Sequence, residues 1–169
     1  MFAEILVLVA LPLLLAAAAS WDVASFTIPN FLNLALMAAF AVFAVSVGLS
    51  FSAIGWHVLA GVIALAIGFT LFAFGHIGGG DAKLFAVVVL WLGLKDSLPY
   101  ALLASVFGGM LAIGLLGFRQ WALPPFLAGY RWIVTLHDSQ AGVPYGVALA
   151  AGAFILLPST EIFRLAAGA

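Results

Sequence analysis

Six apolar runs, separated by short polar or glycine- and proline-containing breaks, account for most of the chain. They cover residues 2–19, 31–49, 53–74, 82–94, 98–117 and 146–163. A helix needs about 20 apolar residues to cross the roughly 30 Å hydrocarbon core of a bilayer, and every run except 82–94 is near that length. The pattern therefore predicts an all-α, polytopic membrane protein with about six transmembrane helices.

The longest break, residues 119–142, mixes aromatic and charged side chains. Trp121, Tyr130 and Trp132 lie there among Arg119 and Arg131. Aromatic rings are enriched at the level of lipid headgroups, so this pattern indicates a segment in the membrane interface. No internal repeat, low-complexity tract or second-domain boundary is visible. We therefore expect residues 1–169 to form a single membrane-embedded domain.

The composition supports a lipid environment, because 67% of the residues are hydrophobic and only 7% are charged. Soluble domains carry about 25% charged residues. The net charge of −1 gives no reason to expect a nucleic-acid partner. The absence of cysteine excludes disulfides, thiolate metal sites and a cysteine nucleophile. His57, His76 and His137 are not spaced as metal ligands on one helix, so we expect neither a metal nor another cofactor.

The order of the predicted spans places two acids on the same side of the membrane. The chain crosses twice between Asp22 and Asp81, and twice more before residues 119–145. The basic residues nearest this side are Lys83, Arg119 and Arg131, and those nearest the other side are Lys95 and Arg164. This excess favours the cytoplasmic side for both acids, because basic residues concentrate there.

Asp22 and Asp81 are the acids at or near span ends on this side, and Asp138 lies in the polar break. Acids at the membrane are energetically costly and often functional. Two adjacent carboxyl groups tend to share one proton, so the ionised member can activate water while the other protonates a leaving group. The alternative is that Asp81 only caps a helix and Asp22 is a solvated loop charge.

Asp81 follows three glycines, Gly78-Gly79-Gly80. Glycines permit close backbone approach and unusual dihedral angles beside the acid, although three glycines also suit a flexible turn. A phosphate-binding loop does not fit, because Lys83 lacks the required spacing from glycine and no Ser or Thr follows it.

Three motifs together resemble the type IV prepilin peptidases. The run 78–84, Gly-Gly-Gly-Asp-Ala-Lys-Leu, is similar to the family's glycine-x-glycine-aspartate motif. Asp22, upstream of Ile28-Pro29-Asn30, resembles the first catalytic aspartate with its Ile-Pro-Asn segment. Val143-Pro144-Tyr145-Gly146 resembles a short element before the final helix. The resemblance extends over nearly the whole chain.

The resemblance implies a membrane-embedded aspartyl endopeptidase that removes the leader peptide from prepilin-like precursors carrying a hydrophobic helix. It implies a multi-pass protein of the bacterial inner membrane that serves type IV pilus assembly and protein secretion, with its site near the cytoplasmic face. Asp22 and Asp81 are the implied catalytic residues. Gly78, Gly80, Lys83, Pro29, Asn30, Pro144 and Tyr145 are the implied supporting or substrate-binding residues.

The small size resembles the tight-adherence (Flp-type) branch. The chain lacks the cysteine-containing methyltransferase portion of larger members, so the resemblance does not extend to N-methylation. It also lacks the arginine that members often have before Ile-Pro-Asn, with Val23-Ala24-Ser25-Phe26-Thr27 in that place.

Two other functions remain open from the sequence. A small transporter or channel could use Asp22 and Asp81 to bind a cation or relay protons. A non-catalytic subunit of a pilus or secretion assembly could carry the same acids as helix caps. The sequence also leaves open the precursor cleaved, which acid is the base, and whether the chain forms a homo-oligomer.

Overall fold

The computed structural model describes residues 2–168, and every regular element in that range is helical. In chain order the elements are α1 (Phe2–Ile5), η1 (Leu6–Ala10), α2 (Leu11–Ser25), α3 (Asn30–Ser46), α4 (Phe51–Ala73), α5 (Gly79–Arg119), α6 (Arg131–His137), α7 (Tyr145–Leu156), η2 (Leu157–Ser159) and α8 (Glu161–Ala167). The prediction of an all-α protein is therefore confirmed.

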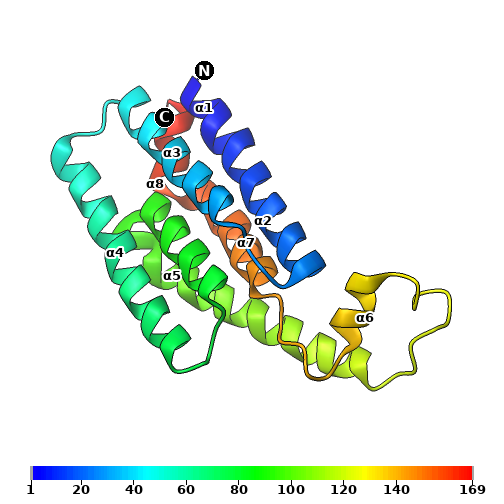
Figure 1. Cartoon of the computed structure of the whole chain (residues 1–169). Helices are drawn as coiled ribbons and strands as arrows, with labels where there is room; N and C mark the ends of the chain where they lie inside the picture. The colour runs from blue at the N-terminus through cyan, green and yellow to red at the C-terminus, as the bar shows by residue number, and fades with distance from the viewer. Residues whose placement is uncertain (1, 169) are drawn as a thin grey trace.

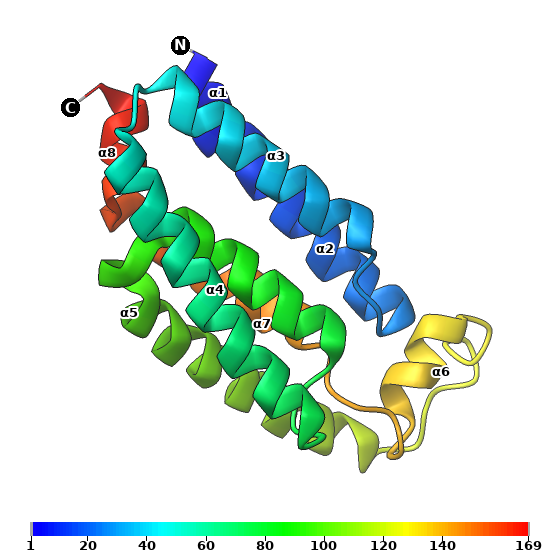
Figure 2. The ribbon, with the colours of Figure 1, turned by 60° about the vertical axis from the view of Figure 1, so that its left-hand side comes forward.

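The long helices lie side by side in one bundle (Figures 1 and 2). α1, the π-helical turn η1 and α2 follow one another without a break in helical direction. α1 and α8 lie at one end of the bundle. The connection from α2 to α3, the start of α5 and the small helix α6 lie at the opposite end, as Figure 2 shows most clearly.

Several helices are suited to a bilayer, which makes this a polytopic membrane protein. Among residues 2–168, the helices Ala3–Ser25, Phe51–Ala73 and Gly79–Arg119 are each long and apolar enough to cross. The segment Tyr145–Ser159 joined to Glu161–Ala167 adds a further candidate, bent by 57°. α3 is apolar but shorter. Helix length thus supports three or four spans when α5 is counted as one helix, although α5 is broken at Gly93. The predicted count of six is not shown by helix length.

Gly93 interrupts α5 and turns the chain back on itself (Figures 1 and 2). Its φ of 76° and ψ of 178° suit glycine, which has no Cβ to clash. A Cβ there would also lie 3.2 Å from His57 Cε1. The His57 ring bonds the Leu90 carbonyl at 2.8 Å between its Nδ1 and that oxygen. The break predicted at Lys95–Asp96 therefore occurs slightly earlier, at a glycine that the imidazole packs against.

The first helix continues beyond its predicted end at residue 19, as far as Ser25. The polar residues expected to break it bond within it instead. Ser20 Oγ donates to the Ala16 carbonyl and Ser25 Oγ to the Trp21 carbonyl, as helical serines commonly do. Asp22 is consequently in the last turn of α2, whereas the sequence placed it in the connecting loop.

Close packing fixes the first half of α5, which carries Asp81. On one side α4 approaches it closely at Gly68. A Cβ on Gly68 would lie only 3.1 Å from Ala82 Cβ, so the contact depends on the absence of a side chain there. On the other side, Trp91 is fully buried and donates from Nε1 to the Leu36 carbonyl of α3 at 3.0 Å. Dense packing of this kind limits movement of a helix, so the Asp81 backbone is held from two sides.

Candidate functional site

Asp22 and Asp81 lie at the same end of the bundle, which we call the acid end. Asp22 comes from the last turn of α2 and Asp81 from the first turn of α5. The two carboxyl groups are close enough for the charge of Asp22 to act on Asp81. The fold therefore brings together the two acids that the sequence selected.

The Asp22 carboxylate is buried at the start of α7. Only 4% of the residue is exposed, and its Oδ2 accepts a hydrogen bond from the Gly146 N–H at 2.7 Å. Gly146 lies in the first turn of α7, where backbone N–H groups lack partners within the helix. The partial positive charge of that helix end also favours an anion. A distant segment thus supplies the donor that satisfies the buried acid.

Asp81 is less buried than Asp22, and its hydrogen-bond donor is close to it in the sequence. It is half-buried, and its Oδ2 accepts from the Gly78 N–H at 3.2 Å. Gly78 is the residue immediately before α5, so the acid bonds the first free N–H of its own helix. The sequence alternative placed Asp81 before the helix as its cap, whereas Asp81 is the third residue of α5 and bonds back to the residue that precedes the helix.

Ile28 packs between the glycines next to the two acids. A Cβ on Gly80 would lie 3.2 Å from both Ile28 Cβ and its backbone nitrogen, and one on Gly146 would lie 3.1 Å from Ile28 Cδ1. Glycine at both positions lets the α2–α3 connection approach α5 and α7. Gly146 and Ile28 were absent from the predicted site residues, although both belong to the motifs that contain Pro144 and Pro29.

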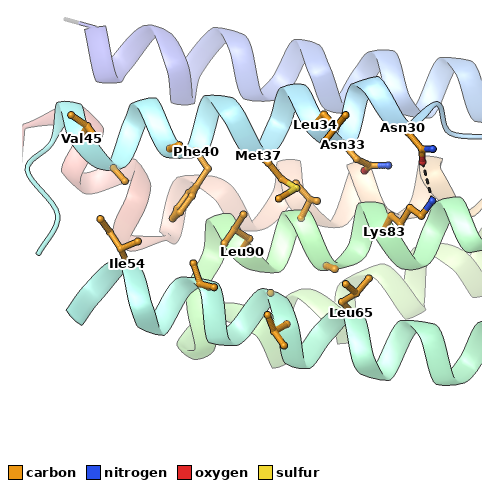
Figure 3. A pocket seen from close by; sticks show the side chains of 17 residues that line it. Asn30, Asn33, Leu34, Met37, Phe40, Val45, Ile54, Leu65, Lys83 and Leu90 are labelled. Carbon is orange, nitrogen blue, oxygen red and sulfur yellow. Dashed lines mark hydrogen bonds between the residues drawn. The ribbon is translucent and has the colours of Figure 1, made fainter. Parts of the chain in front are cut away.

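Pro29, Asn30 and Lys83 occupy the junction between α3 and α5. Pro29 has an extended ψ of 139° immediately before α3, and Asn30 is the first residue of that helix. Lys83 Nζ donates to Asn30 Oδ1 at 2.9 Å, which the dashed line in Figure 3 marks. The predicted supporting residues on these two helices are therefore in direct contact with each other.

Pro144 and Tyr145 form the entry to α7. Pro144 is fully buried immediately before the helix, and Tyr145 is the first helical residue. The Tyr145 ring covers Gly108 in the second half of α5, where a Cβ would lie 2.5 Å from Tyr145 Cε1. This contact sets the position of the α7 start, and with it the Gly146 N–H that reaches Asp22.

The predicted interfacial segment is folded back against the end of α5. Arg119 Nε donates to the Leu136 carbonyl and its Nη2 to the Gly142 carbonyl, each at 2.8 Å. Trp121, with 78% of its surface exposed, presents an aromatic ring outside this fold. Asp138 is also exposed, where it accepts from the Gln140 N–H, so it stays apart from the acid pair.

Asp22 and Asp81 are the acids that the fold places at this site. Within residues 2–168, no group of three or more His, Cys, Asp or Glu side chains is placed to hold a metal ion. One ionised and one protonated carboxyl group, side by side, can take a proton from water and give one to a leaving group.

A comparison of the sequence with models of protein families finds a match. The model of the type IV leader peptidase family matches residues 9–113, more than half of the chain. The match contains both acids and the glycines before Asp81, and it ends before α7. No curated protein and no solved structure matches the chain. From the extent of the family match, the chain belongs to the type IV leader peptidase family.

Proposed function

We propose that this protein is an aspartyl endopeptidase that cleaves the leader peptide from prepilin-like precursors. The proposal includes a single peptidase domain over residues 1–169, in the bacterial inner membrane. The observation that carries it is the meeting of Asp22 and Asp81 at one end of the bundle, each bonded to the N–H of a glycine. Membership of a leader peptidase family supports the reaction class.

In the proposed reaction the two acids share one proton. The ionised carboxylate takes a proton from a water molecule as the water oxygen attacks the carbonyl carbon of the peptide bond. The protonated carboxyl group then donates to the nitrogen as the C–N bond breaks, which releases the leader and a new amino terminus. Because the acids are coupled, the proton belongs to the pair.

The two acids differ in burial, which suits them to different roles in the proposed reaction. Asp22 is almost fully buried and held by Gly146, so its position is fixed. Asp81 is half-exposed, so it is the more accessible of the two. A precursor whose hydrophobic helix lies in the bilayer and whose leader extends into water would present its cleavage junction at this membrane-boundary site.

The decisive experiment uses the purified protein in lipid nanodiscs. The substrate is a synthetic peptide with a basic leader and a hydrophobic helix, and mass spectrometry follows the products. Wild type is compared with Asp22→Asn and Asp81→Asn, which keep the size and an acceptor oxygen but cannot ionise. Asp138→Asn is the matched control, because Asp138 is an exposed acid at the same end of the bundle.

We expect wild type and Asp138→Asn to cleave at the leader junction. We expect each of the other two variants to lose activity by about 10²–10⁴-fold, the usual contribution of general acid–base catalysis. A chelator should have no effect. Full cleavage by folded Asp22→Asn or Asp81→Asn would contradict the proposed catalytic pair. No cleavage by folded wild type would favour the non-catalytic subunit, in which the two acids act only as helix caps.

We also propose that the acid end faces the cytoplasm. The natural absence of cysteine allows a direct test, in which a single cysteine is introduced at Ser139 or at Ser52. Ser139 lies in the exposed segment at the acid end and Ser52 at the opposite end, and both are exposed. In intact cells, a membrane-impermeant thiol reagent should label Ser52→Cys and spare Ser139→Cys. The reverse pattern would place the acids outside.

A further inference from the structure

A long apolar groove runs between α3 and α4 (Figure 3). Its volume is about 730 Å³, and the first half of α5 forms its floor. Most of its lining is aliphatic, including Met37, Val58, Val62 and Leu65. We call it the α3–α4 groove.

The groove exists because two consecutive helices do not pack against each other. α3 and α4 are joined by the short connection 47–50, and helices joined this closely ordinarily lie in contact. Here both pack against the first half of α5, which separates them. A groove with two helical walls and a helical floor has the shape that receives a further helix.

The polar end of the groove coincides with the acid end of the bundle. Asn30 and Lys83 line it there and are bonded to each other, as Figure 3 shows. Lys83 lies two positions after Asp81 in the same helix. Residues two apart on a helix lie on different faces, so Asp81 is at the same level along α5 as this end of the groove but does not line it.

The side-chain amide of Asn33, one turn further along α3, is buried without a hydrogen-bond partner among the described residues. The residue is only 5% exposed, and neither its Oδ1 nor its Nδ2 has a partner among the described residues. The side chain lines the groove, and in Figure 3 its amide projects from α3 on the side facing α5. An unsatisfied buried amide is destabilising, so its presence here points to a ligand that supplies a donor and an acceptor.

We propose that the α3–α4 groove binds the apolar helix of the peptide substrate, with the first turn of that helix beside Asn33. This assignment rests on the proposed leader-peptide cleavage. The first turn of any helix has N–H groups without partners in the helix, and an Asn Oδ1 can accept from them. The Asn33 Nδ2 can donate to a carbonyl of the extended segment before the helix. Both amide atoms are covered in the free protein, so the proposal requires the Asn33 side chain to turn toward the groove on binding.

The dimensions and chemistry of the groove favour a peptide helix over a lipid chain. The α3 wall runs from Asn30 to Val45, about 22 Å at ~1.5 Å per residue, which matches a helix of about 15 residues. An acyl chain would fill the aliphatic part but has no group that could bond Asn33. In this orientation, the peptide bond before the substrate helix lies at the acid end, where Asp22 and Asp81 can reach it.

Photo-cross-linking in nanodiscs tests the occupant directly. A photoreactive amino acid replaces Val62 in one variant and its neighbour Ile63 in another, both in the Asp81→Asn background so that the peptide stays intact. Val62 lines the groove and Ile63 does not, although both are exposed, by 56% and 42%. The probe is a fluorescent peptide with a basic leader and an apolar helix. We expect at least tenfold more cross-linking at Val62, and competition by unlabelled peptide.

Wild-type cleavage of the same peptide, run in parallel, separates this inference from the proposed function. Cleavage with equal labelling at Val62 and Ile63, or with lipid at Val62 that the peptide cannot displace, overturns the groove and leaves the peptidase intact. Strong labelling at Val62 without any cleavage supports the groove and contradicts the peptidase. If the peptide is neither cross-linked at Val62 nor cleaved by wild type, both the groove proposal and the proposed peptidase function are overturned.

Two substitutions provide an independent test. Ala41→Trp fills the groove, whereas Ala38→Trp adds the same ring to an exposed position of α3 outside it. We expect Ala41→Trp to raise the KM for the peptide about tenfold, and Ala38→Trp to leave it unchanged. Asn33→Leu should raise KM by a similar factor without lowering the thermal unfolding midpoint, because it removes an unsatisfied amide. An unchanged KM in both Asn33→Leu and Ala41→Trp overturns the proposal.

Discussion

The two acids accept similar hydrogen bonds, but the donors differ in how far they lie from the acid along the chain. Each carboxylate accepts a hydrogen bond from the backbone N–H of a glycine near the start of a helix. The donor to Asp81 is Gly78, three residues away, whereas the donor to Asp22 is Gly146, 124 residues away. One half of the site is therefore specified by a local motif, and the other half exists only when the whole bundle is assembled.

The two glycines also differ in what surrounds them. A Cβ on Gly78 would meet only the end of the Asp81 side chain, with the Asp81 Oδ2 at 2.8 Å. A Cβ on Gly146 would lie 2.9 Å from Asp22 Oδ2, 3.0 Å from Asp22 Cβ and close to Ile28. The Asp81 side chain can rotate away, but Asp22 cannot move without its helix. We therefore expect the distant half of the site to be less tolerant of change.

Among the substitutions that test this comparison, Gly146→Ala should cause the largest loss of peptide cleavage. The added methyl group pushes the Asp22 carboxylate away from the α7 start, and a displacement of about 1 Å can lower a catalytic rate by 10²-fold. Peptide cleavage in nanodiscs measures the loss. Gly142→Ala is the control, because a Cβ at that position meets nothing within 4 Å. Equal activity in the two variants would show that Asp22 does not need its present position.

Gly108→Ala should act on the same half of the site through Tyr145. The new methyl group overlaps the Tyr145 ring, and overpacking of this kind costs about 1–3 kcal/mol in the free energy of unfolding. The neighbouring Gly109 has no atom within 4 Å of its Cβ position, so Gly109→Ala should be neutral or stabilising by up to about 1 kcal/mol. Thermal unfolding in detergent distinguishes them. The prediction is wrong if the two variants unfold together.

Gly78→Ala should have a smaller effect, because the conflict is with the end of one side chain. We expect the Asp81 carboxyl group to shift its rotamer, at about 0.5–1.5 kcal/mol, and cleavage to fall several-fold. The unfolding midpoint should change little, since a φ of −72° suits alanine. An activity loss as large as that of Gly146→Ala would remove the distinction between the local and distant halves.

Lys83→Met should have the smallest effect on stability. It removes the bond to Asn30, but Lys83 and Asn30 are exposed, so we expect a loss of at most about 1 kcal/mol in the free energy of unfolding. A double-mutant cycle with Asn30→Ala isolates the pair. A coupling energy well above this value would mean that the junction of α3 and α5 depends on this bond.

The local parts of the structure could be predicted from the sequence. The apolar runs indicated membrane helices, and the glycines before Asp81 indicated a close backbone approach, which Gly80 makes with Ile28. The unusual dihedral angles expected at these glycines do not occur, because none of the three has a positive φ. Asp22 and Asp81 were expected to lie on one side of the membrane, and they do lie at one end of the bundle. These inferences depend on residues near each other in the chain, where hydropathy and glycine content are informative.

The distant parts could not be predicted in the same way. Nothing around Gly146 indicates that its N–H bonds Asp22, because any residue in a first helical turn has a free N–H. The serines near Asp22 suggested a loop but bond within α2. The predicted count of six spans is not shown, and hydropathy does not indicate that α3 is short or that the last helices bend by 57°. Each of these depends on packing between segments.

The bond between Asp22 and Gly146 also has a consequence for the order of synthesis. A ribosome adds about 5–20 residues per second, so Gly146 follows Asp22 by roughly 6–25 s. Asp81 is made within that interval, so for its later part the nascent chain contains both acids, but Asp22 still lacks its partner from α7. The complete acid pair forms only when the chain is almost finished. The proposed peptidase site would therefore be incomplete in a partly made chain.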